Sequence, residues 1–280
     1  MQSSDDATRK LRSGSREPVL RVAGLSTYFA VRQGLLRRTV GHVRAVDGVD
    51  LRVLRGQTLV VAGEAGAGKT TLARSITRAV PTRRGKVLLE GRDLLGLSKS
   101  DFRALGRQVQ SVSAEMLAVP DPLGVLRALT EAEPKLLIFD EAFAGLDDAV
   151  RVGLFEELRR SQNERGLSCL LLTREPKLSS ALADEVAVMH AGQIVETGAT
   201  ASVLGNARHP YTQALLLAKP GASPGQALPA AGAAESLSGC RYRGRCPHAF
   251  ARCAQEEPVL FVVPGGLSRC FLNDPSQVDA

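Results

Sequence analysis

Hydrophobic and polar positions divide the chain into short apolar runs and longer segments with helical periodicity. The first part is dominated by runs rich in Val and Leu and separated by glycine-containing turns, a pattern that is typical of β-strands. These runs occupy residues 19–25, 43–54 and 57–63. After Gly68 the pattern changes, because Leu72, Ile76 and Val80 recur every four residues and predict a helix.

Farther along the chain, apolar strands alternate with amphipathic helices. Strands are predicted at residues 86–91, 136–141, 169–173 and 185–198, and helices at residues 149–162 and 209–218. This alternation is typical of an α/β fold whose core is a parallel sheet, and the β-rich start adds an antiparallel β subdomain.

Composition marks the expected domain boundaries. Residues 1–17 are polar and charged and predict a tail outside the folded core. Residues 219–238 are rich in Pro, Gly, Ala and Ser, which is typical of a linker. The expected organisation is therefore a tail, a main domain at 18–218, the linker, and a small cysteine-rich C-terminal extension at 239–280.

The charge of the chain limits its classes of partner. The formal net charge is +7, but the basic residues are scattered and mostly Arg, which favours a solvated surface. Aromatic residues make up only 4% of the chain, so no nucleic-acid partner is expected. No stretch approaches the length of a membrane span and the polar N-terminus carries no secretory signal, so any membrane association is expected to be peripheral.

A phosphate loop is indicated by the stretch GEAGAGKT, which matches the pattern G-x-x-x-x-G-K-[ST] between a predicted strand and a predicted helix. Its glycines let backbone N–H groups surround phosphate oxygens, and the helix N-terminus favours an anion. Lys69 is expected to reach the β- and γ-phosphates, and the Thr70 hydroxyl to ligate Mg²⁺. The expected cofactor-binding residues of this loop are Gly63, Glu64, Ala65, Gly66, Ala67, Gly68, Lys69, Thr70 and Thr71.

Two acidic residues end the predicted strand LLIFDE. Asp140 is expected to complete the Mg²⁺ shell with Thr70, and Glu141 to polarise the attacking water as the catalytic residue. Many strands end in acids, and these two could instead cap the following helix. The phosphate loop in the same chain favours the nucleotide site.

Beyond these motifs, the chain resembles the ATP-binding subunits of ABC transporters, and more narrowly those of the oligopeptide/dipeptide importers. The resemblance covers residue 19 to about residue 273 with one large gap. It is carried by residues 24–76, by PKLLIFDEAFAGLD at 134–147 and by the C-terminal part of the main domain, where HPYTQALL at 209–216 is a mark of this subgroup.

This resemblance implies a P-loop NTPase fold with ATP and Mg²⁺ as ligands. It further implies a second ABC ATPase subunit and transmembrane permease subunits as partners, an extracytoplasmic peptide-binding protein as an indirect partner, and a place at the cytoplasmic face of the cell membrane. Asp147 falls at the dimer-facing aspartate of the family. Phe29, or less favourably Tyr28, falls where an aromatic ring stacks on adenine, although packing in an edge strand would also explain this pair.

Three departures from the family pattern weaken the expected activity. Family members carry a glutamine where this chain has Ala114, and a switch histidine where it has Arg174. They also carry a helical subdomain that ends in a signature motif, and this chain lacks both. ATP hydrolysis is therefore expected to be weak.

Cysteines dominate the C-terminal extension. The spacing C-x5-C-x6-C-x16-C is formed by Cys240, Cys246, Cys253 and Cys270. Disulfides are not expected without a secretory signal, and zinc sites typically use closer pairs. The resemblance implies that these cysteines bind a [4Fe–4S] cluster, while zinc and unmetallated thiols stay open as alternatives. Cys169, inside an apolar run, is expected in the core.

The function indicated first is a partly degenerate ATP-binding subunit of a peptide-type ABC importer, working as the heterodimer partner of a complete ATPase. The alternative is a regulatory or structural protein that binds a nucleotide and an iron–sulfur cluster and has no role in transport.

Overall fold

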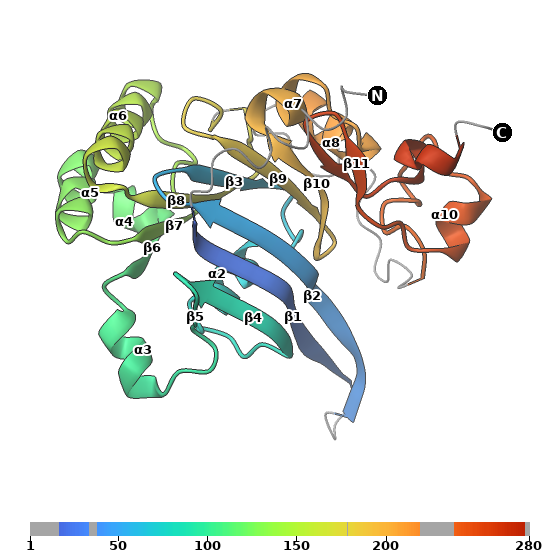
Figure 1. Cartoon of the computed structure of the whole chain (residues 1–280), viewed down its shortest axis with the longest axis horizontal. Coiled ribbons are helices and arrows are strands. Elements are labelled where there is room, and N and C mark those ends of the chain that lie inside the picture. Colours follow the sequence, from blue (N-terminus) through green and yellow to red (C-terminus); the bar gives the residue numbers. More distant parts are fainter. Residues whose placement is uncertain (1–16, 34–37, 178, 219–237, 278–280) are drawn as a thin grey trace.

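The computed structural model describes residues 17–33, 38–177, 179–218 and 238–277. The predicted tail and linker therefore lie outside the described residues, except for Glu17 and Ser238. Two sheets form the framework, with helices on the outer side of the larger sheet and one helix between the two sheets (Figure 1).

The smaller sheet is antiparallel and has the strand order β2-β1-β4-β5. Its strands are β1 (Pro18–Gln33), β2 (Arg38–Leu54), β4 (Arg84–Leu89) and β5 (Arg92–Asp93). The long ribbon of β1 and β2 runs beyond the rest of this sheet and places Phe29 opposite Val43. It is the antiparallel β portion that the sequence predicts.

The larger sheet has the order β11-β12-β10-β9-β3-β8-β7-β6. Its strands are β3 (Thr58–Ala62), β6 (Val109–Ser113), β7 (Leu136–Asp140), β8 (Ser168–Thr173), β9 (Glu185–His190), β10 (Gln193–Ala199), β11 (Phe261–Val263) and β12 (Gly266–Ser268). The strands from β9 to β6 are parallel, and β10, β12 and β11 are antiparallel. The predicted strand at 185–198 is thus two strands joined by a turn at Ala191 and Gly192.

The helices connect these strands. They are α2 (Lys69–Ile76), α3 (Lys99–Leu105), α4 (Ala114–Leu117), α5 (Pro122–Glu131), α6 (Asp148–Arg165), α7 (Thr200–Gly205), α8 (Pro210–Leu217) and α10 (Ala251–Gln255), followed by 3-10 turns at Phe271–Asn273 and Pro275–Gln277. Among the described helices, none is long and apolar enough to cross a membrane.

Successive side chains of the buried strands point to opposite faces of the larger sheet, so a hydrophobic core forms on each face. In β7, Leu137 and Phe139 pack with α6 residues such as Leu154, whereas Leu136 and Ile138 pack toward α2 and the smaller sheet. A strand buried on both faces reads as a continuous apolar run, which is why LLIFD shows no alternation in the sequence.

The register of the parallel strands brings the predicted site residues together at one edge of the larger sheet. Ala62 of β3 lies opposite Thr173 of β8, and Asp140 of β7 lies opposite Leu172 of the same strand. The residues that follow β3, β7 and β8 therefore meet at the carboxyl edge of the sheet, where open α/β folds bind ligands.

The C-terminal segment, which we define as residues 238–277, is joined to the main sheet. β12 pairs with β10, and β11 extends the sheet beyond β12. In Figure 1 this segment is drawn in red, on the side of the molecule opposite α5 and α6.

Candidate functional site

Glycines allow the phosphate loop to turn from β3 into α2. Gly68, the N-cap of α2, has φ 107°, and a Cβ built on it would lie 2.0 Å from the carbonyl oxygen of Ala45. A Cβ on Gly63 would lie 2.3 Å from the carbonyl oxygen of Met189. Only glycine fits at these two positions, so the pattern of the loop has a steric cause.

Lys69 is the first residue of α2, and its side chain is only 5% exposed. Its Nζ donates to the carbonyl oxygens of Gly63 at 2.7 Å and Glu64 at 3.0 Å, and it lies 3.2 Å from Glu141 Oε1. Burial lowers the pKa of Lys69, and the nearby Glu141 opposes that shift. The ammonium group is thus held inside the loop, where phosphate oxygens would meet it.

Thr70, which follows Lys69 in α2, forms the contact expected of a magnesium site. The hydroxyl of Thr70 donates to Asp140 Oδ1 at 3.1 Å, which joins the start of α2 to the end of β7. Hydroxyl and carboxylate oxygens are the ligands that Mg²⁺ prefers, so these two residues fit the ion.

Glu141 leaves the end of β7 in a left-handed conformation with φ 52°. Its carboxylate accepts a hydrogen bond from the backbone N–H of Arg174 at 3.2 Å, and Oε1 lies 3.6 Å from Arg174 Nε. Together with Lys69, these contacts place the carboxylate between two cations. A non-glycine residue at positive φ is typical of functional sites.

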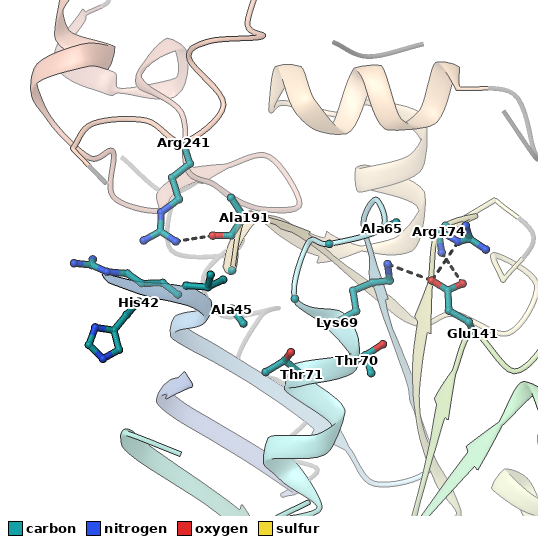
Figure 2. Close-up of a pocket in the computed structure, with 15 residues that line it drawn as sticks. His42, Ala45, Ala65, Lys69, Thr70, Thr71, Glu141, Arg174, Ala191 and Arg241 are labelled. Atoms are coloured by element: carbon teal, nitrogen blue, oxygen red, sulfur yellow. Dashed lines mark hydrogen bonds and ion pairs between the residues drawn. The ribbon is translucent and has the colours of Figure 1, made fainter. Parts of the chain in front are cut away.

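The phosphate loop, Glu141 and Arg174 line one cavity of about 650 Å³. Figure 2 shows Lys69 and Arg174 converging on Glu141 on one side, and Arg241 reaching Ala191 on the other. The described residues that line it include Lys69, Arg174, Arg241 and Arg44, against a single acidic side chain, that of Glu141. This excess of positive charge suits a polyphosphate.

The remaining predicted residues differ in their distance from this cavity. Ala65, Gly66 and Thr71 line it. Asp147 is exposed at the N-cap of α6 and is not among the residues that line it. Phe29 does not line it either, but it is 41% exposed and lies directly opposite Val43, which does.

The neighbouring Tyr28 is engaged elsewhere. Its hydroxyl donates to Asp47, and the guanidinium groups of Arg44 and Arg83 lie 5.6 and 5.2 Å from its ring centroid. Of the two aromatic candidates, Phe29 is thus the one whose ring is not held between charged side chains.

Three residues that contact the phosphate loop or line its cavity are not among the site residues that the sequence predicts. Arg241 and Arg245 reach the site from the C-terminal segment, and Tyr211 reaches it from α8. Glu64 lies 147 positions from Tyr211 and 181 from Arg245 in the sequence, and Ala191 lies 50 positions from Arg241. The only sequence signal is that each of these arginines stands next to one of the clustered cysteines, Cys240 or Cys246.

The four C-terminal cysteines line one small pocket, together with His209 and Tyr242. Burial raises the pKa of the Cys270 thiol to about 11 and raises the pKa of Cys240 and Cys246 as well. Among the described residues, however, no group of three or more His, Cys, Asp or Glu side chains is arranged to hold a metal ion. The structure therefore does not support the predicted [4Fe–4S] cluster.

Cys169 behaves as expected. It is fully buried in β8, and burial raises the pKa of its thiol to about 12. Its assignment to the core is confirmed.

Two family models match the chain. Residues 46–123 match the model described as ABC transporter, and residues 195–253 match the model described as oligopeptide/dipeptide transporter, C-terminal region. The second match includes β10 from Val195 onward, the HPYTQALL segment and three of the four clustered cysteines.

Similar proteins carry related names. The chain is 30% identical to the oligopeptide transport ATP-binding protein OppF of Salmonella typhimurium, with 88% of this chain and 93% of that protein covered. It is 29% identical to the probable peptide ABC transporter ATP-binding protein y4tS of Sinorhizobium fredii, with 93% and 91% covered. It is 30% identical to the glutathione import ATP-binding protein GsiA of Salmonella paratyphi A, covering 76% of this chain and 43% of that protein.

Solved structures agree on the fold. The ATP-binding cassette MJ1267 of an ABC transporter, in its ADP conformation, matches with a TM-score of 0.56 at 17% identity, covering 72% of this chain and all of that one. The transporter component cbiO1 from Clostridium perfringens matches with a TM-score of 0.55 at 18% identity, covering 68% of this chain and 92% of that one. The P-loop NTPase fold of the ABC ATPase type is thereby confirmed.

Proposed function

The chain belongs to the family of ATP-binding proteins of oligopeptide/dipeptide ABC transporters, and from this premise we propose that it is a degenerate ATP-binding subunit of a peptide importer. It binds Mg²⁺ and ATP, hydrolyses ATP slowly, and pairs with a complete ATPase subunit. The observation that carries this proposal is the state of Glu141, whose carboxylate is paired with Lys69 and with Arg174 at the end of β8.

Nucleotide binding rests on residues that already lie in position. Lys69 and the backbone N–H groups of the loop hold the phosphates, and Thr70 and Asp140 hold Mg²⁺. When bound, Mg²⁺ neutralises the charge of the phosphate oxygens. Phe29 stacks on the adenine ring, since it faces the same side of the β1–β2 ribbon as the cavity residue Val43.

Slow hydrolysis follows from the residues around Glu141. Arg174 stands where the family has a histidine, and a guanidinium group cannot accept a proton. Ala114 directly follows Ser113, the β6 residue that pairs with Asp140, and offers no side-chain ligand for Mg²⁺ or water. Each missing positioned group costs about 10²-fold in rate.

A missing helical subdomain is supported by two observations. Between β6 and β7, where every residue is described, the chain forms only the short helices α4 and α5. The alignments with y4tS and OppF run over 323 and 315 residues, which is more than the 280 residues of this chain. Without a signature motif the chain would need a complete ATPase as its partner, and transmembrane permeases would hold the pair at the cytoplasmic face of the membrane.

The experiment compares binding with turnover. We expect the purified chain to bind ATP with Mg²⁺ in an equilibrium titration and to show little hydrolysis alone. Co-purification from membranes should recover a second ATPase and permease subunits. A turnover of about one per second approaches ordinary enzyme rates. If the wild-type chain showed this turnover and Glu141→Gln abolished it, the proposed degenerate site would be contradicted.

The iron–sulfur cluster stays a prediction of the sequence. Four thiols that line one pocket are the right kind of donor, although the described side chains are not arranged around a metal. Iron and sulfide analysis of protein purified without oxygen tests it directly. Stoichiometric zinc without iron, or no metal at all, would exclude the cluster.

A further inference from the structure

The C-terminal segment is joined to the phosphate loop by a partly buried ion pair. Arg245 donates to both carboxylate oxygens of Glu64, at 3.1 and 2.8 Å, and their side chains are only 6% and 16% exposed. Glu64 is the second residue of the loop, so its position sets the path of the backbone that faces the phosphates. A two-pronged arginine–carboxylate contact fixes orientation as well as distance.

The backbone of Glu64 is held as firmly as its side chain. Its N–H donates to the hydroxyl of Tyr211 at 2.9 Å, and its carbonyl oxygen accepts from Lys69 Nζ at 3.0 Å. Tyr211 is fully buried and packs edge-on against Tyr242 of the C-terminal segment, with ring centroids 5.4 Å apart. The loop thus rests on α8, which in turn rests on the C-terminal segment.

A second arginine braces the opposite wall of the cavity. Arg241, only 5% exposed, donates to the carbonyl oxygen of Ala191 at 2.5 Å and pairs with the buried Asp47 of β2. Next in the chain, the N–H of Gly192 donates to the carbonyl oxygen of Ala67 at 2.9 Å. Arg241 therefore holds the turn between β9 and β10, and that turn holds the phosphate loop.

Asp47 connects Arg241 to β1, the strand that carries Phe29, the predicted adenine-stacking residue. Burial raises the pKa of Asp47, but the hydrogen bonds from Tyr28 and Arg241 outweigh burial and bring the pKa below its usual value. The carboxylate is therefore charged and shared between β1 and the C-terminal segment. Removing Arg241 would leave this buried charge with less compensation.

We propose that Arg241 and Arg245 are positioning residues of the nucleotide pocket, through which the C-terminal segment fixes the phosphate loop in its binding geometry. The inference rests on the proposed nucleotide binding. Neither arginine needs to touch the nucleotide for this role. Supporting residues of a binding site typically contribute on the order of 10- to 100-fold in affinity.

The test is an equilibrium titration of the full chain with a fluorescent ATP analogue and Mg²⁺. Arg245→Ala and Arg241→Ala should each weaken binding at least about tenfold. Arg252→Ala is the matched control, because Arg252 pairs with Glu256 and Asp274 inside the C-terminal segment. Its affinity should stay within about twofold of the wild type.

Two further variants separate positioning from a loss of folding. Arg245→Lys keeps the charge and should recover part of the affinity, while Glu64→Gln breaks the same pair from the other side. If the pair acts as a unit, Arg245→Ala combined with Glu64→Gln should bind no more weakly than the weaker single variant. Additive losses, or arginine variants that bind as tightly as Arg252→Ala, would overturn the inference.

The outcomes also separate this inference from the proposed function. A wild-type chain that fails to bind the analogue contradicts both. A wild-type chain that binds, with unchanged affinity in Arg241→Ala and Arg245→Ala, contradicts the inference alone.

Discussion

At the scale of single residues, the side chain after β8 determines what Glu141 can do. Arg174 contacts both carboxylate oxygens of Glu141, one through its backbone N–H and one through its guanidinium group. The Glu141 carboxylate is therefore already engaged by two cationic side chains, those of Lys69 and Arg174.

Replacing Arg174 by histidine should therefore raise ATP turnover. An imidazole can accept a proton or a hydrogen bond, and it releases Glu141 from one cation; we expect a gain of about tenfold or more. A phosphate-release assay with saturating ATP and Mg²⁺ measures it in the presence of the partner ATPase. Arg174→His combined with Glu141→Gln should show no gain, and an unchanged rate in Arg174→His would mean that Arg174 does not restrain the site.

Another single residue makes stability depend on pH. His209 is 2% exposed, and its Nδ1 accepts the N–H of Tyr211 at 3.0 Å as the cap of α8. Burial, together with the nearby His190, lowers the pKa of His209 from 6.5 to about 3. Below pH 6.5 the unfolded chain binds a proton that the folded chain does not bind until about pH 3.

Stability should accordingly fall as the pH drops through this window. At about pH 5 the loss attributable to His209 is on the order of 2 kcal/mol relative to neutral pH. Denaturant unfolding at about pH 7.5 and about pH 5 measures it, with His209→Gln as the comparison because glutamine can cap the helix without titrating. Equal losses in the two proteins would assign the pH dependence to other groups.

At the scale of elements, the turn from β3 into α2 depends on one glycine more than on its neighbour. Gly68 and Gly66 both have positive φ, at 107° and 80°. A Cβ on Gly68 meets the backbone of Ala45, whereas a Cβ on Gly66 meets nothing within 4 Å. The two positions therefore separate steric contact from backbone strain.

Gly68→Ala should lower the thermal midpoint and weaken ATP-analogue binding, because the backbone of β2 or of the loop must shift. Gly66→Ala should cost only the strain of its conformation, about 1–2 kcal/mol. Thermal unfolding and the same titration measure both effects. Equal destabilisation by the two changes would show that contact with Ala45 is not the deciding factor.

Helices and strands are the features that the sequence predicts best. The strands at 136–141 and 169–173 and the helix at 209–218 are found as β7, β8 and α8, because long apolar runs and strong caps are local signals. The turn inside 185–198 was missed, since its only local signs are Ala191 and Gly192. The contacts of Arg241 and Arg245 could not be predicted, because they depend on packing between distant segments.

The HPYTQALL stretch shows how a mark of resemblance can have a physical cause. Its histidine caps α8, its proline occupies the first turn, and Tyr211 supports the phosphate loop through Glu64. Local pattern predicted the helix, but only the fold reveals that this helix is part of the nucleotide site.

At the scale of the whole molecule, the nucleotide cavity is assembled from the β1–β2 ribbon, the carboxyl edge of the larger sheet and the C-terminal segment. In the proposed heterodimer, Arg174 and Ala114 would weaken the site on this chain. The proposed lack of a signature motif, which in the family contacts the nucleotide held by the opposing subunit, would weaken the partner's site instead. The two proposed defects therefore fall on different nucleotides.

The brace between Arg245 and Glu64 also implies a reciprocal effect. When nucleotide binding and closure of the C-terminal segment are coupled, each changes the equilibrium of the other by the same factor. Bound nucleotide should therefore stabilise the closed position of the segment as much as that position stabilises bound nucleotide. The thiols of Cys253 and Cys270 are buried in this segment, and burial raises the pKa of Cys270 to about 11, so we expect them to react mainly when the segment opens. Saturating ATP with Mg²⁺ should therefore slow their modification by a thiol reagent, and Arg245→Ala should abolish that protection.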